Sequence, residues 1–246
     1  MSIIELFWPA FSLAIMLVFI HTIFGLEIIK RGVIFTDLAV GQIAAIGMAI
    51  SIAFMQGQWQ TTMTLTFAIM AAVLISIATK RVPNIEAFIG LLYALGVSAL
   101  MLILAQSSEG TELFKQISAS DILFTSQEDV IKSSLIYISV AGVMFGIYPR
   151  LQGLIKELVF FIMLAIVVSF SVQSAGVLVV FALLIAPAYI ALVQQRFTTL
   201  PFAWIFGSIS VISAMIISYT YDLPTGYTII FVLVLTTLIS VFALSL

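Results

Sequence analysis

Long apolar runs separated by short polar connections make up most of this 246-residue chain. A helix needs about 20 predominantly apolar residues to cross the hydrocarbon core of a bilayer. Nine runs approach or reach that length: residues 8–29, 33–55, 60–79, 87–106, 133–149, 158–173, 176–193, 201–219 and 226–246. The run at 133–149 is short, and the division before Gly176 is the least distinct. The pattern therefore predicts an all-α integral membrane protein, a polytopic bundle of eight or nine transmembrane helices.

Basic residues fall on alternate connections between these runs. Seven of the nine lysines and arginines belong to one set of alternating connections: Lys30, Arg31, Lys80, Arg81, Arg150, Lys156 and Arg196. The other set carries Lys115 and Lys132, which lie among several acidic residues. Cytoplasmic loops are enriched in Lys and Arg, so the first set is expected to face the cytoplasm. The N-terminus is then outside and, with nine spans, the C-terminus is inside.

The composition agrees with this prediction. Hydrophobic residues make up 63% of the chain and charged residues 8%, whereas a soluble domain carries about 25% charged residues. The formal net charge is −2, and without a basic stripe no nucleic-acid partner is expected. Cysteine is absent, which excludes disulfides and thiolate metal sites. The first residues lack the basic start and cleavage site of a secretory signal, so we expect the first span to remain in the mature protein.

One long stretch, residues 107–132, is not apolar. Its charged residues are Glu109, Glu112, Lys115, Asp121, Glu128, Asp129 and Lys132. One interpretation is a solvated loop that contains a short surface helix, and the other is a segment that contacts a soluble partner. In either case the stretch separates the first four predicted spans from the others.

Ionisable side chains inside a membrane span are costly, which makes them candidates for functional sites. Asp37 lies about one turn into the second predicted span. Gly41, Ala44 and Ala45 follow it at helical spacing, so this small-residue face is expected to pack inside the bundle together with Asp37. Two interpretations remain open. Asp37 is either a ligand for a cation that crosses the protein, or a carboxylate that pairs with the basic residues before it or caps the helix.

Four other positions in the predicted spans carry polar groups or constrain the backbone. Gln42 is a candidate for the same pathway, with a hydrogen bond to a neighbouring helix as the alternative. His21, the one histidine of the chain, is a candidate metal ligand because imidazole binds zinc, manganese and iron, with a cross-helix hydrogen bond as the alternative. Glu27 is expected to form an ion pair at the interface. Pro187 either kinks the seventh span as a gate or is a tolerated structural proline.

Sequence motifs for common enzymatic chemistry are absent. The chain has no G-x-x-x-x-G-K-[ST] loop, no H-E-x-x-H and no G-x-S-x-G. It therefore lacks a phosphate-binding loop for ATP, and one histidine without any cysteine leaves few groups for hydrolytic catalysis. We do not expect an enzyme.

Four segments resemble the membrane subunits of bacterial ABC importers for manganese, zinc and iron. In residues 25–46, Arg31, Phe35 and Asp37 fall on the family's pattern of a span ending in basic residues, then an aromatic, then Gly-Asp-Ala-x-Ser-His. Residues 121–130 are similar to the family's Gly-Asp-Ile-Leu-x-Val-Ser-x-x-Asp-Val. Residues 176–188 are similar to its Gly-x-Leu-Leu-Val-x-Ala-Leu-Leu-Ile-x-Pro-Ala. Residues 222–226 are similar to its Asp-x-Pro-Ser-Gly. Their order and spacing over most of the chain make the resemblance fairly specific.

Two features depart from the family's pattern. Gly41 stands where the family has a histidine after the aspartate, and Gln42 comes next. The cytoplasmic stretch over residues 149–157 is shorter than the segment that docks on the ATPase in the family. The first departure bears on the identity of the ion, and the second bears on the docking geometry.

The resemblance implies a function and a set of partners. The chain is expected to be a single permease domain, residues 1–246, that carries zinc or manganese, or else iron, across the bacterial inner membrane into the cytoplasm. Two ATPase subunits, an outer metal-binding protein and a second permease subunit are the implied partners, and no cofactor is expected apart from the transported ion.

Five residues are the candidates for this function. Asp37, Gln42 and His21 are assigned to the pathway, with Asp37 and His21 as metal ligands. Arg150 and Lys156 are assigned to the ATPase contact, with a role in topology alone as the alternative. A gradient-driven ion transporter or channel, which would also use intramembrane ionisable groups, and a scaffold subunit without a pathway are the alternative functions.

Overall fold

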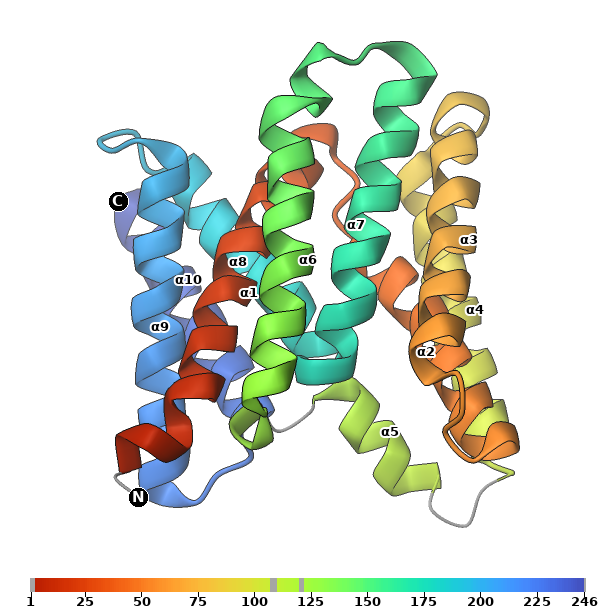
Figure 1. Ribbon diagram of the computed structural model, residues 1–246. Helices are drawn as coiled ribbons and strands as arrows, with labels where there is room; N and C mark the ends of the chain where they lie inside the picture. The colour runs from red at the N-terminus through yellow and green to blue at the C-terminus, as the bar shows by residue number, and fades with distance from the viewer. Residues whose placement is uncertain (1–2, 107–109, 120–121, 246) are drawn as a thin grey trace. The chain divides into compact units, whose positions relative to one another are not determined.

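The computed structural model describes residues 3–106, 110–119 and 122–245, and within these ranges it is helical with no β-strand (Figure 1). The elements are α1 (Ile3–Arg31), α2 (Thr36–Met55), α3 (Gln60–Arg81), α4 (Ile85–Leu104), α5 (Gly110–Ser118), η1 (Ile122–Phe124), α6 (Gln127–Gly146), η2 (Tyr148–Arg150), α7 (Gly153–Ala175), α8 (Val177–Val193), α9 (Thr199–Tyr221) and α10 (Thr225–Ser245). Each of the nine predicted spans corresponds to one helix. The all-α prediction is confirmed.

The number of helices that can span a membrane depends on α8. Among the described residues, eight helices are long and apolar enough to cross a bilayer, and α8 is a shorter apolar helix of 17 residues. The predicted division before Gly176 is present, because α7 ends at Ala175 and α8 begins at Val177. Gly176 has a φ of 86°, a backbone conformation that favours glycine and ends α7. The described residues thus contain eight helices long enough to span a bilayer, and α8 is a ninth, shorter apolar helix. The predicted number of eight or nine transmembrane helices agrees with this.

Several buried hydroxyl groups inside these helices donate to a carbonyl oxygen of their own helix. Thr22, Ser169 and Ser171 each donate to the carbonyl oxygen four residues earlier, at 2.6–2.8 Å. A hydrocarbon environment offers no water for such groups, so a bond within the same helix removes the cost of burying them. These polar residues therefore need no partner on a neighbouring helix.

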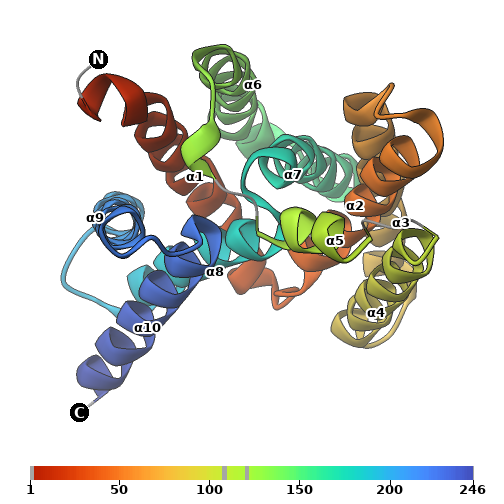
Figure 2. The same cartoon turned by 90° about the horizontal axis from the view of Figure 1, so that it is seen from below.

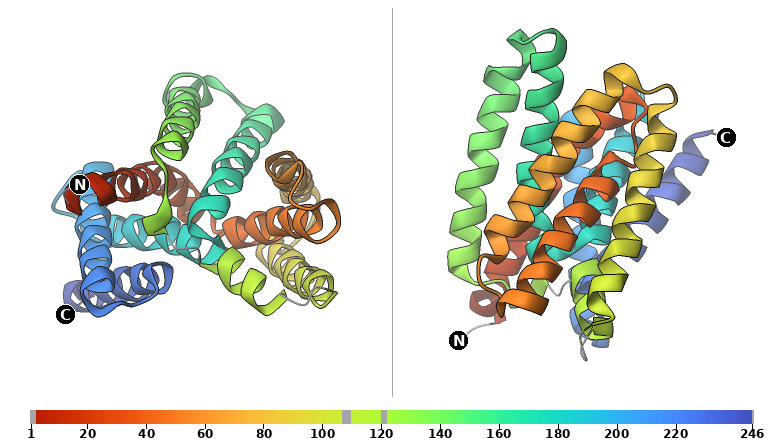
Figure 3. Two further views of the ribbon diagram at one scale, coloured as in Figure 1. Left: turned by 60° about the horizontal axis from the view of Figure 1, so that its bottom comes forward. Right: turned by 90° about the vertical axis from the view of Figure 1, so that its right-hand side faces the viewer.

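The helices group into two compact units, which are described separately. The first unit comprises the described residues within 1–31, 119–137 and 174–246, and the second comprises those within 32–118 and 138–173. In the first unit, α8 packs against α1, α9 and α10 (Figure 2). In the second unit, α2 packs against both α3 and α4 (Figure 3). Each unit is therefore organised around one helix, α8 or α2, that contacts several others.

Glycines allow close helix contacts in the first unit. A Cβ atom added to Gly25 of α1 would overlap the backbone carbonyl oxygen of Leu184 on α8. A Cβ atom added to Gly207 of α9 would lie 2.7 Å from Cγ1 of Val18 and 3.0 Å from Cγ of Pro187. Small residues of this kind let helix backbones approach closely within a membrane. The packing around α8 therefore depends on the absence of side chains at these two positions.

The second unit uses the same device around α2. A Cβ atom added to Gly47 would overlap the carbonyl oxygen of Met63 on α3, and one added to Gly96 of α4 would lie 2.9 Å from Cβ of Gln42. Asp37, Gly41, Ala44 and Ala45 are all buried, so the predicted small-residue face of α2 does lie inside the protein.

The stretch at 107–132 contains a short helix, as the first of its two interpretations expects. In α5, Glu112 and Lys115 are exposed while Ile117 is buried. Glu109 and Asp121, together with the start of the second resembling segment, lie outside the described residues.

Helix α6 begins at Gln127, whereas the hydrophobic pattern predicts a start near residue 133. The side chain of Ser126 and that of Asp129 bond to each other at 2.6 Å, and each also bonds the other's backbone N–H, at 3.2 and 3.3 Å. This reciprocal cap stabilises a helix start, and the 2.7 Å ion pair between Lys132 and Glu128 supports the next turn. Polar interactions thus extend α6 beyond its apolar part.

A test of this packing is the substitution Gly25→Ala. The added methyl group would force α1 away from α8, so we expect the free energy of unfolding to fall by about 1–3 kcal/mol. The matched control is Gly90→Ala in α4, where an added Cβ meets no atom within 4 Å, and where alanine favours the helix by up to about 1 kcal/mol. Thermal melting of the two purified variants in detergent measures the difference. Equal melting temperatures would contradict the close contact.

Candidate functional site

Asp37 is a buried carboxylate that accepts no hydrogen bond in the part of the chain that the structure describes. It is the second residue of α2, and it is 1% exposed. Neither Oδ1 nor Oδ2 has a hydrogen-bond partner there. Removing one partner of a buried ion pair costs several kcal/mol because the remaining charge is uncompensated. The N-terminus of α2 offsets part of this cost, since the helix dipole favours a negative charge in the first turn.

The surroundings of Asp37 within α2 bear on its interpretation as a helix cap. The expected interfacial ion pair of Glu27 is present, with Arg31 at 3.8 Å. The residue at the start of α2 is Phe35, which makes no side-chain capping bond. Since the oxygens of Asp37 bond to no backbone N–H among the described residues either, Asp37 is not a helix cap.

Gln42 and Ser76 add further unsatisfied polar atoms to the second unit. Gln42 of α2 is 4% exposed, and its Oε1 has no partner within the described ranges. Its hydrogen bond to a neighbouring helix, expected as the alternative, is therefore not seen at this oxygen. Ser76 of α3 is fully buried, and its Oγ is likewise without a partner there. A buried serine in a membrane helix gives no distinctive sequence signal, so Ser76 could not be selected from the sequence.

Glu86 is an acidic residue of α4 that contacts the start of α2, and the hydrophobic pattern did not single it out. It belongs to the first turn of α4, and its Oε1 accepts a hydrogen bond from the backbone N–H of Phe35 at 3.2 Å. Its Oε2 is buried and has no partner among the described residues. The fourth predicted span begins at residue 87, so the sequence alone places Glu86 in a connection and gives no reason to relate it to Asp37.

His21 belongs to the first unit and is fully buried in α1. Its Nδ1 lies 2.8 Å from the carbonyl oxygen of Leu17. A carbonyl only accepts hydrogen bonds, so Nδ1 carries the hydrogen and Nε2 keeps its lone pair. Nε2 has no partner in the described part of the chain. Both the tautomer and the free nitrogen are those of an imidazole that binds a metal, and the expected cross-helix bond is replaced by one within α1.

Taken together, these side chains do not form a complete metal site. Over the described residues, no group of three or more His, Cys, Asp or Glu side chains could hold a metal ion. Asp37 and Gln42 share α2, whereas His21 belongs to the other unit. Each is therefore a separate candidate for a pathway.

Arg150 and Lys156 flank a short connection: Arg150 ends η2, whereas Lys156 lies in the first turn of α7 and not in the link where the sequence placed it. Arg150 ends η2 and is exposed, and α7 begins three residues later at Gly153. Nζ of Lys156 lies 5.0 Å from the ring centroid of Tyr148, and this ring packs on Phe160 with centroids 6.0 Å apart. A cation over an aromatic face is attracted by the ring quadrupole. The connection is thus a compact turn with a basic surface.

The surroundings of Pro187 favour a structural role. It is buried within α8, which continues on both sides of it from Val177 to Val193. Its ring packs beside Gly207 of α9. The surroundings thus match the tolerated structural proline that was one of its two interpretations.

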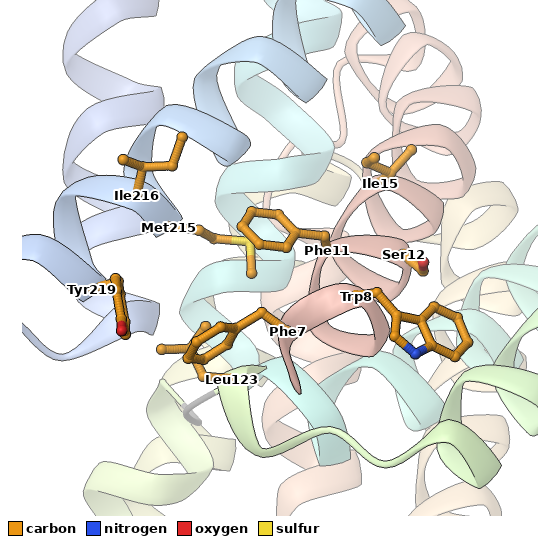
Figure 4. Close-up of a pocket in the computed structure, with 9 residues that line it drawn as sticks. All are labelled: Phe7, Trp8, Phe11, Ser12, Ile15, Leu123, Met215, Ile216 and Tyr219. Atoms are coloured by element: carbon orange, nitrogen blue, oxygen red, sulfur yellow. The ribbon is translucent and has the colours of Figure 1, made fainter. Parts of the chain in front are cut away.

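A cavity of about 450 Å³ lies in the first unit between α1, η1 and α9 (Figure 4). Its walls are mainly aromatic and aliphatic, and Figure 4 shows Phe7 and Phe11 of α1 and Met215 of α9 among the side chains that line it. Among the described residues that line it there is no Asp, Glu or His, the side chains that divalent cations favour.

Comparisons with known proteins agree with the resemblance found in the sequence. The model of the ABC 3 transport family matches residues 150–244. No curated protein gives a significant match. Among solved structures, PsaBC from Streptococcus pneumoniae in complex with Fab has a TM-score of 0.75 and 19% identity, covering 95% of this chain and 90% of that one. An inward-facing ABC transporter provisionally assigned to the metal-chelate type has a TM-score of 0.72 and 14% identity, covering 96% of this chain and 85% of that one.

The family match and the shared fold support each other. The family model runs from the last residue of η2 through α7, α8 and α9 into α10, and it includes two of the four segments that resemble ABC importers, at 176–188 and 222–226. The structural matches extend the same fold over nearly the whole chain. Residues 150–244 thus match the ABC 3 transport family, and nearly the whole chain shares its fold with the two solved structures.

Proposed function

We propose that this chain is the permease of an ABC importer that carries a divalent transition-metal ion, zinc or manganese first and iron next, across the bacterial inner membrane. The observation that carries the proposal is Asp37, a buried carboxylate whose oxygens accept no hydrogen bond from the described residues. A buried carboxylate is costly without a partner, so it is suited to binding a cation reversibly. The similar fold of the transporter provisionally assigned to the metal-chelate type supports a cargo that contains a metal.

The donor types of the two candidate ligands favour transition metals. Carboxylate oxygen suits manganese, and imidazole nitrogen suits zinc and iron. Asp37 and His21 are separate candidates, one donor of each kind, and neither the carboxylate oxygens nor Nε2 of the imidazole has a partner among the described residues. Gln42, five residues after Asp37, would add a neutral oxygen. Gly41 leaves α2 without the imidazole that the family pattern has after the aspartate, so the donor set differs from that pattern.

Transport would depend on further subunits. We infer a pair of cytoplasmic ATPases, an outer metal-binding protein and a second permease, identical or different, since these are the parts that the family resemblance implies. The match of residues 150–244 to the ABC 3 transport family favours ATP as the energy source over an ion gradient. Arg150 and Lys156 form the basic turn that we assign to the ATPase contact.

The substitution Asp37→Asn tests the ion path directly. It removes the negative charge without changing the size of the side chain, so uptake of manganese-54 and zinc-65 by cells should fall about tenfold or more. The amount of the chain in the membrane should stay the same, because an uncharged side chain is cheaper to bury. Asp129→Asn is the control, since asparagine also caps helices well. Normal uptake by the Asp37→Asn variant would show that Asp37 has a structural role and is not part of the ion path.

The double substitution Arg150→Ala with Lys156→Ala tests the coupling turn. Loss of both charges should weaken the ATPase contact, so the assembled transporter in proteoliposomes should hydrolyse ATP while moving several-fold less metal per ATP. The control is Lys115→Ala with Lys132→Ala, which removes two basic residues from the opposite set of connections. If the ratio of metal moved to ATP hydrolysed were unchanged in the first variant, the assignment would be withdrawn.

A further inference from the structure

The first turn of α2 has no cap from its own sequence. The residue at its start is Phe35, whose side chain cannot accept a hydrogen bond. Thr36 turns instead toward the preceding connection, with its backbone N–H and its hydroxyl both donating to the carbonyl oxygen of Val33, at 3.1 and 2.7 Å. Helices whose first N–H groups lack acceptors fray at that end.

A residue 51 positions away supplies the missing acceptor. Oε1 of Glu86 accepts the N–H of Phe35 at 3.2 Å. Glu86 itself is placed by the first turn of α4, which begins at Ile85 after the left-handed residue Asn84. A carboxylate at this position is also favoured by two helix N-termini, that of α2 and that of α4. The bond therefore fixes the start of α2 to the start of α4.

This attachment determines where the carboxylate of Asp37 lies. Asp37 is two residues after Phe35 in the same turn, and its oxygens make no hydrogen bond of their own with the described residues. Its position is therefore set by the backbone of that turn. Further along the two helices, Gly96 of α4 approaches Gln42 of α2. The two helices therefore contact each other at two places.

We infer that Glu86 is a positioning residue for transport: by accepting the N–H of Phe35 it holds the first turn of α2, and so presents Asp37 to the ion. This inference rests on the proposed function of Asp37. The hydrogen bond is the essential feature, and the negative charge of Glu86 is not. A glutamine at this position would keep an oxygen acceptor in the same place.

The test compares Glu86→Ala, Glu86→Gln and the exposed control Glu128→Ala in cells with the complete transporter. The half-saturating concentration of manganese or zinc for uptake should rise about tenfold in Glu86→Ala, as expected for the loss of a hydrogen bond to a charged group. It should stay within about twofold in Glu86→Gln and Glu128→Ala. A role in stability alone would instead lower the maximal rate in proportion to the amount of chain in the membrane. Glu86→Gln that is as impaired as Glu86→Ala, or Glu86→Ala with normal half-saturation, would overturn the inference.

A second measurement separates this inference from the proposed function. Hydrogen–deuterium exchange of the peptide over residues 33–40, in purified protein without any metal, should be faster in Glu86→Ala than in the wild type, and unchanged in Glu86→Gln. Unchanged exchange in Glu86→Ala would show that the bond does not hold α2, whatever Asp37 does. Faster exchange combined with normal uptake by Asp37→Asn would leave the attachment intact and remove the proposed function.

Discussion

The absence of water in a hydrocarbon core is the constraint from which this structure follows. Every backbone N–H and carbonyl must find a partner within the chain, and a helix does this along its own axis. Some buried serine and threonine hydroxyls do the same by donating to the carbonyl oxygen one turn back, as those of Thr22 and Ser169 do. Against this background the carboxylate of Asp37, which has no hydrogen-bond partner among the described residues, is costly to bury.

Helix α2 is where packing and the proposed function meet. Its small residues, among them Gly41 and Ala44, allow it to be buried deeply. That burial removes Asp37 and Gln42 from the lipid. The same close packing brings the start of α4 to the start of α2, where Glu86 supplies an acceptor. A tightly packed helix with a polar beginning can thus offer a charge to an ion without exposing it to hydrocarbon.

Much of the fold could be predicted because lipid makes hydrophobicity and length decisive. Each predicted span became one helix, and the break at Gly176 falls where the pattern placed it. The small-residue face of α2 followed from helical spacing. The start of α6 was wrong because the cap formed by Ser126 and Asp129 extends the helix beyond its apolar part.

The candidate site was less predictable than the fold. Asp37 and His21 stand out in the sequence because ionisable groups are rare in membrane spans. The residues around them cannot be identified in the same way. Near Asp37, for example, the contact of Glu86 with Phe35 joins residues 51 positions apart. The bond of His21 within its own helix depends on its side-chain conformation, which residue spacing does not determine.

The central claim is that this permease admits a transition metal to the cell. The most direct measurement is the total manganese, zinc and iron in cells with the gene deleted and in cells with it restored, grown at limiting metal and analysed by mass spectrometry. The account predicts that at least one of the three metals falls in the deleted cells and recovers on restoration. Equal contents of all three metals in both cultures would contradict it.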